Sequence, residues 1–300
     1  MSDTLRGCLW MIGAIASFTL MAVAGREVSL ELDTFEIMLY RSLIGVALVV
    51  MVSRLAGTHG QITTQNMPLH LVRNLCHFTG QNLWFYAITV LPLAQVFALE
   101  FTSPFWVMLL GFVILGERLT KNRVLAAVVG FLGILIVTRP LPETFQIGQV
   151  AAAIAAIGFA GSAVFTRLLT RSTTITCILF WLTVMQAGFG LVCAGFDGNI
   201  AVPAAASWPW VTVIACAGLI AHFCLTSALR LAPATVVMPI DFTRLPVIAL
   251  VGITLYQEPL DPYVLIGAVV IFAANYVNIR LETATSPNLR SDTVKTVTKT

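Results

Sequence analysis

Hydrophobic residues occur in ten long runs along the chain, and short polar stretches separate these runs. Each run is close to the roughly 20 residues that an α-helix needs to cross a bilayer. The pattern therefore predicts ten transmembrane helices, at about residues 8–25, 35–53, 71–90, 94–115, 122–138, 147–166, 174–195, 210–229, 235–256 and 263–279.

The second half of the chain repeats the first. A shift of 141 residues places Pro92 on Pro233 and Thr102 on Thr243 without a gap. The same shift aligns Gly7 with Gly148, Phe18 with Phe159, Arg26 with Arg167, Glu100 with Asp241 and Glu117 with Glu258. The chain is thus a duplicated unit of five helices. Because five is odd, the second unit must enter the membrane from the opposite side.

The predicted fold is therefore an all-α integral membrane protein that consists of two inverted five-helix repeats. The first repeat is expected to occupy residues 1–141 and the second residues 142–282. Residues 283–300 contain many Thr and Ser residues and few apolar ones, so we expect a disordered cytoplasmic tail there.

Positive charge divides unevenly between the two sides of the predicted membrane domain. With the N-terminus inside, the cytoplasmic connections and helix ends hold Arg6, Arg54, Arg73, Arg118, Lys121, Arg123, Arg167, Arg171, Arg230 and Arg280. The outer side holds only Arg26 and Arg139. Such a bias orients multispanning proteins. We therefore expect a multi-pass protein of the cell inner membrane with both termini in the cytoplasm.

Composition supports the membrane assignment and narrows the function. Apolar residues make up 58% of the chain and charged residues 10%, with a mean hydropathy of +0.91. The net charge of +3 does not indicate a nucleic-acid partner. The chain has no P-loop, no cysteine pair at metal-ligand spacing and no cluster of histidines beside a nucleophile. We expect neither catalysis nor a cofactor or metal.

A polar stripe runs along the third predicted helix. Asn74, His77, Gln81 and Trp84 are spaced by three or four residues, so they share one helix face, and Phe85 lies beside them. This face is poorly suited to lipid. Two interpretations are open: the stripe is the wall of a substrate cavity, or its side chains hydrogen-bond neighbouring helices as packing contacts.

Two acids and two arginines lie inside apolar runs. Arg41 and Glu100 are at similar depth in the second and fourth helices, so we expect them to meet. Asp241 and Arg244 are three residues apart and share a face of the ninth helix. Such groups are costly to bury in hydrocarbon and are candidates for function. The alternative is two structural pairs that only neutralise themselves.

Further candidates have plainer alternatives. His222 repeats the position of Gln81 and is either a proton carrier or a packing residue. Glu117 and Glu258 end helices and favour a capping or helix-contact role. An aromatic stripe on the fourth helix is either a packing surface or a stacking surface for an aromatic substrate; it comprises Phe97, Phe101 and Phe105.

Several of these features resemble the EamA-like branch of the drug/metabolite transporter superfamily. They are the two five-helix halves, Tyr40-Arg41, the proline turn before the fourth helix, and Gly116-Glu117-Arg118-Leu119 followed by Gly130 and Gly133. The resemblance covers about residues 5–280. The second copy departs from it, with Gln257 where Gly116 stands in the first copy and Ala274 at the place of Gly133.

The resemblance implies a secondary transporter that moves a small organic metabolite by alternating access. Within this family, the first hundred residues of the chain are most similar to riboflavin importers. Transporters of S-adenosylmethionine or amino acids are the alternatives. Another class is a non-transporting membrane sensor or subunit. The cavity is expected between the third, fourth, eighth and ninth helices. The expected partners are the small-molecule substrate and membrane lipid, and a homodimer is left open.

Overall fold

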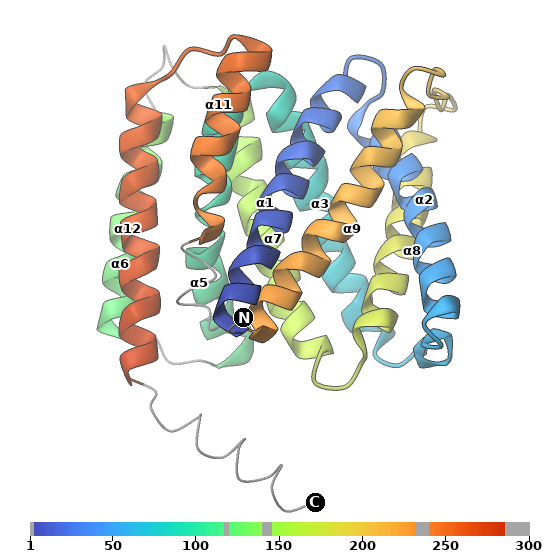
Figure 1. Cartoon of the computed structure of the whole chain (residues 1–300), viewed down its shortest axis with the longest axis horizontal. Coiled ribbons are helices and arrows are strands. Elements are labelled where there is room, and N and C mark those ends of the chain that lie inside the picture. Colours follow the sequence, from blue (N-terminus) through green and yellow to red (C-terminus); the bar gives the residue numbers. More distant parts are fainter. Residues whose placement is uncertain (1–2, 117–119, 140–145, 232–239, 286–300) are drawn as a thin grey trace, which may run out of the picture.

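The computed structural model describes residues 3–116, 120–139, 146–231 and 240–285, and their regular secondary structure is helical (Figure 1). The first half forms α1 (Asp3–Val28), α2 (Thr34–Leu55), the short η1 (His59–Gln61), α3 (Met67–Val90), α4 (Leu93–Glu100), α5 (Ser103–Leu115) and α6 (Lys121–Thr138). The second half forms α7 (Ile147–Leu169), α8 (Ile175–Ala194), α9 (Trp208–Leu231), α11 (Arg244–Tyr256) and α12 (Pro262–Thr285). Most of the predicted tail lies outside the described residues.

Several helices are long and apolar enough to cross a membrane. Within the described residues there are six such spans and three shorter apolar helices. The longer spans are Leu5–Val28, Thr34–Leu55, Leu93–Leu115, Ile147–Leu169, Ile175–Ala194 and Trp208–Leu225. The chain is therefore a multi-pass membrane protein. α3 is 24 residues long but is not among these spans, because the polar stripe lowers its hydropathy.

Helices of the two halves pack against one another in a symmetric pattern. α1 lies against α9, α3 against α7, α2 against α8, and α6 against α12. Exchanging each helix for its counterpart in the other half turns the α1–α9 pair into the α7–α3 pair and leaves α2–α8 and α6–α12 unchanged. Figure 1 shows the last two pairs at opposite edges of the molecule. This arrangement is that of a duplicated unit with a pseudo-two-fold relation.

The contact between α3 and α7 is very close. A Cβ atom at Gly158 of α7 would lie 2.8 Å from both the Cys76 carbonyl oxygen and the Gly80 Cα atom of α3. Small residues let helix backbones approach in membrane proteins, where van der Waals packing holds helices together. The sequence therefore needs glycine here for the two repeats to meet.

The fourth predicted helix is interrupted, which corrects the expectation of one helix through residues 94–115. α4 ends at Glu100 and α5 begins at Ser103. Pro104 has no N–H to donate to the Glu100 carbonyl, so the regular helix ladder cannot continue. The Ser103 hydroxyl donates to that carbonyl at 2.7 Å, and Asn275 Nδ2 donates to the Phe101 carbonyl at 3.0 Å. These side chains satisfy the backbone groups that the break releases.

The second half begins α11 in the same way. Thr243 precedes the helix and its hydroxyl donates to the Ile240 carbonyl at 2.7 Å, as Thr102 does to Leu99 at 2.7 Å. Both interruptions follow an acid, Glu100 or Asp241. Interrupted helices at matching positions in two repeats are a common feature of substrate sites in transporters.

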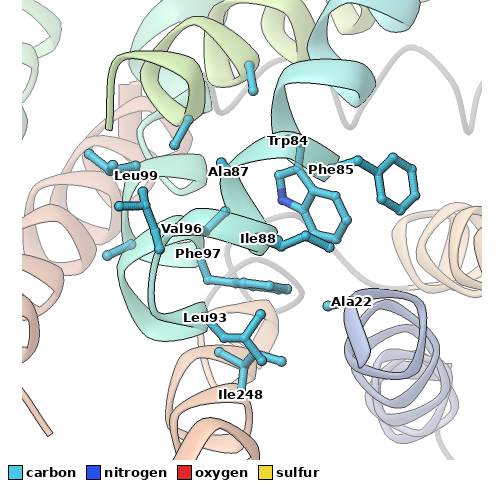
Figure 2. Packing of buried hydrophobic residues seen from close by; sticks show 14 of the residues in the cluster. Ala22, Trp84, Phe85, Ala87, Ile88, Leu93, Val96, Phe97, Leu99 and Ile248 are labelled. Atoms are coloured by element: carbon cyan, nitrogen blue, oxygen red, sulfur yellow. The ribbon is translucent and has the colours of Figure 1, made fainter. Parts of the chain in front are cut away.

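The larger apolar core of the described residues extends through both halves, and one part of it lies where the α3–α4 turn meets α1 and α11. Figure 2 shows Trp84 and Phe97 at its centre, with Leu93 and Ile248 below them. Trp84 is 3% exposed and Phe97 is fully buried. The core holds the carboxyl end of α3 and the whole of α4 in place, and so fixes the position of Glu100 at the end of α4.

Candidate functional site

The polar stripe of α3 faces the protein interior. Asn74, His77, Gln81, Trp84 and Phe85 are each 5% exposed or less. This agrees with the expectation that the face avoids lipid. Its members nevertheless differ in their contacts, and they divide between a pocket, a packed core and an ion cluster.

A pocket lies between helices of both halves, at the level of His77. Its empty volume is about 380 Å³, part of which is open space. The lining comes from α2, α3, α8 and α9 and comprises Arg41, Ser42, Gly45, His77, Leu182, Thr183, Gln186, Ala215, Gly218, Leu219 and His222. We call it the Arg41 pocket.

Arg41 has no acid partner within this pocket or elsewhere in the described residues. Its one hydrogen-bond contact there is from Nη1 to the Met38 sulfur, at 3.9 Å. A Cβ atom at Gly218 would lie 3.3 Å from Arg41 Nη2, so glycine at this position of α9 leaves room for the guanidinium. A guanidinium at this depth in a membrane protein is costly unless something hydrogen-bonds it.

The expected pairing of Arg41 with Glu100 is therefore wrong. Equal depth does not make two helices neighbours: α2 packs against α8 and α9, whereas α4 packs against α11 and α7. Glu100 instead pairs with a residue of the second half.

Glu100 lies in an ion cluster at the helix interruptions. Its Oε1 accepts from Arg244 Nη2 at 3.0 Å, and its Oε2 accepts from Trp84 Nε1 at 2.8 Å. Arg244 Nη2 also lies 3.5 Å from Asp241 Oδ2, which confirms the proximity expected from their spacing. We call Glu100, Asp241 and Arg244 the ion cluster. It joins the interrupted helix of one half to that of the other.

Aromatic rings surround the Arg244 guanidinium. Its Cζ atom lies 4.6 Å from the ring centre of Phe18 and 5.1 Å from the ring centres of Phe97 and Phe101. These cation–π contacts stabilise a charge that is taken out of water. Phe97 and Phe101 thus contact the cluster and are buried, and Phe105 is buried too. The aromatic stripe on this helix packs inside the protein.

Phe18 connects the ion cluster to the Arg41 pocket. Its ring centre lies 5.6 Å from that of His222, with the two planes near perpendicular. His222 in turn lies 6.2 Å from His77 between ring centres. His77 Nδ1 is 3.4 Å from the Ser162 hydroxyl. The two candidate regions are therefore separated by a few side chains.

The rest of the stripe has other roles. Asn74 Oδ1 accepts from Arg73 at 2.7 Å and its amide donates to the Trp181 carbonyl at 3.2 Å, which is a packing contact between α3 and α8. Gln81 Oε1 is buried with no hydrogen-bond partner in the described residues. Phe85 belongs to the apolar core.

The observed pocket matches half of the predicted cavity. Of the four helices expected to line it, the third and eighth predicted helices, α3 and α9, do so. The fourth and ninth, which contain α4–α5 and α11, hold the ion cluster instead. α2 and α8 complete the wall, and Gln186 on α8 was not identified from the sequence. A polar residue within an otherwise apolar run was the available signal.

Arg26 is in the last turn of α1 and joins the two halves. Figure 1 shows that this end of α1 lies opposite the N-terminus. Arg26 Nε donates to the Ile88 carbonyl at 2.6 Å, Nη2 donates to the Leu91 carbonyl at 2.5 Å, and Nη1 pairs with Glu258. Glu258 Oε2 also accepts a hydrogen bond, at 2.9 Å, from the backbone N–H of Leu93, which is the first residue of α4. Glu258 therefore has the helix-contact and capping role expected for it. Glu117 lies outside the described residues.

Other contacts between the halves lie at the same end. Arg139 pairs with Asp261. Glu31 accepts hydrogen bonds from the Ser207 hydroxyl and, at 2.6 Å, from the Ala204 N–H, and these bonds lower the pKa of its carboxyl. These contacts join the two halves at the end opposite the N-terminus. At the end that holds the N-terminus, Arg54 and Arg171 are exposed, and Trp181 Nε1 of one half donates to the Thr63 carbonyl of the other at 2.7 Å.

Comparison with known proteins agrees with this duplicated architecture. The EamA-like transporter family matches the chain twice, over residues 5–139 and 146–280. The chain belongs to the EamA-like transporter family. The two matches start 141 residues apart, which is the shift that aligns the two halves in the sequence. Both the Arg41 pocket and the ion cluster take residues from each EamA-like repeat.

Several curated relatives of this EamA-like protein are transporters. A riboflavin transporter of Brucella anthropi is 30% identical over 229 residues, or 75% of this chain and 81% of the relative. An S-adenosylmethionine uptake transporter of Rickettsia bellii is 23% identical and aligns over 91% and 94% of the two chains. The pseudopaline exporter CntI of Pseudomonas aeruginosa is 29% identical over 89% and 94%. The protein is a membrane transporter.

A solved crystal structure has the same fold. It superimposes with a TM-score of 0.65 at 17% sequence identity, over 94% of this chain and 99% of the other.

Proposed function

We propose that this protein is a secondary transporter that carries a small organic metabolite, in first preference riboflavin, into the cell by alternating access. It moves the substrate without changing it chemically. The observation that carries the proposal is the Arg41 pocket, whose polar lining comes from both repeats. A site between two inverted repeats can be exposed to either side when one repeat moves against the other.

In this proposal the residues of the pocket and of the ion cluster have different tasks. Arg41, His77 and His222 contact the substrate. Glu100, Asp241 and Arg244 hold the interrupted helices of the two repeats together while the site changes its exposure. Asn74, Gln81, Trp84 and Phe85 position α3 between the two groups.

Riboflavin is the first preference because the Brucella relative is named for it and is 30% identical. The flavin ring is planar and aromatic, and the pocket region holds His77, His222 and the nearby Phe18. S-adenosylmethionine is a second candidate, since the Rickettsia relative aligns over a larger share of this chain.

The proposed topology is ten transmembrane helices in two inverted repeats, residues 1–141 and 142–282, in the bacterial inner membrane. Both termini and the tail from residue 283 onward lie in the cytoplasm. The exposed arginines at the end that holds the N-terminus support this orientation.

Growth rescue tests the function. Bacteria that cannot make riboflavin are transformed with a plasmid that expresses this chain or with an empty vector. Both strains are grown on low external riboflavin. We expect growth with the chain and none without it, and equal growth of both on high riboflavin. Failure of a chain that reaches the membrane to support growth would reject riboflavin uptake.

Thiol labelling tests the topology separately. Thr58→Cys lies in the connection after α2, and Asn199→Cys in the connection after α8, at the opposite end. We expect an impermeant reagent to label Asn199→Cys in intact cells above the background of the unsubstituted chain. Thr58→Cys should be labelled only after permeabilisation. The reverse pattern would reverse the orientation.

A further inference from the structure

The wall of the Arg41 pocket contains an acceptor whose orientation is fixed. Gln186 of α8 is 2% exposed, and its amide nitrogen donates to the Asn74 carbonyl at 3.1 Å. Its Oε1 atom is buried and has no hydrogen-bond partner in the described residues. Exchanging the amide nitrogen and oxygen would bring Oε1 against the Asn74 carbonyl, and two acceptors repel. Gln186 therefore offers an acceptor in this wall.

Arg41 supplies donors in the same pocket. A guanidinium has five N–H groups, and those of Arg41 meet no oxygen acceptor among the described residues. No Asp or Glu lines the pocket. The wall therefore combines a strong unmatched donor with a buried unmatched acceptor. Gln186 Oε1 is buried and Arg41 is half-buried, and a polar group that is shielded from water without a hydrogen bond costs free energy, so a ligand that pairs with both groups is favoured.

We propose that the pocket binds the imide edge of its substrate: a ring N–H flanked by carbonyl groups, as in the pyrimidine ring of a flavin. This rests on the function proposed above and identifies the part of the substrate that the site selects. The imide N–H donates to Gln186 Oε1, and a neighbouring carbonyl oxygen accepts from Arg41. The imide edge thus carries both kinds of group that the wall lacks.

Other ligand groups match the wall less well. A carboxylate alone accepts from Arg41 but places a second acceptor near Gln186 Oε1. An amino-acid head group has a carboxylate for Arg41 and an ammonium donor for Gln186 Oε1, but both of its charges must be taken out of water, and no protein carboxylate lines the pocket to pair with the ammonium. The imide edge is uncharged, so it costs less to transfer out of water.

The test compares two flavins that differ at one nitrogen. Purified protein in lipid nanodiscs is titrated with riboflavin and with 3-methylriboflavin, in which the imide N–H is replaced by N–CH₃, and binding is followed by flavin fluorescence. We expect wild type to prefer riboflavin by about tenfold or more, since the methylated analogue leaves the Gln186 acceptor unpaired.

Variants assign this preference to Gln186. Gln186→Leu has a similar size but no acceptor, so it should bind the two flavins with nearly equal, weaker affinity. Thr212→Val is the control: Thr212 is an α9 residue outside the pocket lining, and its hydroxyl bonds the Trp208 carbonyl of its own helix at 2.9 Å. It should keep the preference. The wild-type comparison stands even if a variant does not fold.

The outcomes separate this inference from the proposed function. If wild type binds both flavins equally, the imide edge is rejected and riboflavin remains the substrate. If wild type binds no riboflavin, the riboflavin assignment is rejected and the inference with it. If S-adenosylmethionine displaces riboflavin with higher affinity, and this depends on Gln186, the site binds an amino-acid head group and the inference is overturned.

Discussion

Two arginines inside the apolar helices, the buried Arg244 and the half-buried Arg41, occupy opposite chemical situations. Arg244 is 4% exposed and is matched by two carboxylates and three aromatic rings. Arg41 lines a pocket, and its one hydrogen-bond contact within the described residues is to a methionine sulfur. A protein gains stability by satisfying a buried charge. The arginine that it leaves unsatisfied is therefore the one available to a substrate, and the satisfied one serves the structure.

Removing the satisfied arginine should have the largest effect on stability. Arg244→Met leaves Glu100 and Asp241 as buried acids without a counter-charge, and breaking such a pair costs roughly 3–5 kcal/mol. We expect little folded protein in membranes and a large fall in the melting temperature in detergent. Arg6→Met is the matched control, because Arg6 is in an exposed pair with Asp3, with side chains 54% and 71% exposed.

The triple variant Arg244→Met, Glu100→Gln, Asp241→Asn sharpens this prediction. It removes the stranded charges together with the arginine, so membrane abundance should recover to near the wild-type level. An Arg244→Met variant that is as stable as Arg6→Met would show that the ion cluster does not hold the repeats together.

The contact between Arg26 and Glu258 should have an intermediate effect. Their side chains are 15% and 13% exposed, and Glu258 also accepts from the first N–H of α4. Glu258→Gln keeps the side-chain shape and one acceptor but loses the charge, and hydrogen bonds to charged groups contribute about 1.5–3 kcal/mol. Thermal unfolding should shift by a corresponding amount, and the shift should exceed that of Glu31→Gln at the same end. Equal shifts would mean that the Arg26 contact is no stronger than an exposed one.

The pair of Arg139 and Asp261 should matter least. Its side chains are 36% and 29% exposed, and pairs near solvent contribute about 0–1 kcal/mol. In the wild-type protein Asp261 Oδ1 accepts a hydrogen bond from the Tyr263 N–H at 2.9 Å. Asp261→Asn keeps an oxygen that can accept this bond and removes the charge. We expect a small change in melting temperature that disappears in high salt. A change as large as that of Glu258→Gln would contradict the ranking by burial.

The duplication was predictable from the sequence, because it depends on local patterns that repeat along the chain. Apolar runs and the alignment of Pro92 with Pro233 need no knowledge of neighbours in space. The family matches, at residues 5–139 and 146–280, confirm that repeat. The burial of the α3 stripe was predictable for the same reason, since helix periodicity alone places its members on one face.

The break after Glu100 was missed although its signal was present. The mean hydropathy stays high across Ser103-Pro104, and an average of hydropathy over a window is insensitive to the N–H group that Pro104 lacks. The partner of Glu100 could not be obtained from depth alone. The packing of one repeat against the other decides which helices are neighbours. This packing brings Arg244, and not Arg41, beside the Glu100 carboxylate.

The most direct test of the account is riboflavin uptake per folded molecule of Arg41→Met, reconstituted in liposomes beside wild type. Arg41 has no acid partner to strand, so we expect the variant to fold with a melting temperature close to that of wild type. Its uptake should fall at least about tenfold, because the substrate loses a charged hydrogen-bond donor. Wild-type uptake by a folded Arg41→Met protein would contradict the account and show that the substrate binds elsewhere.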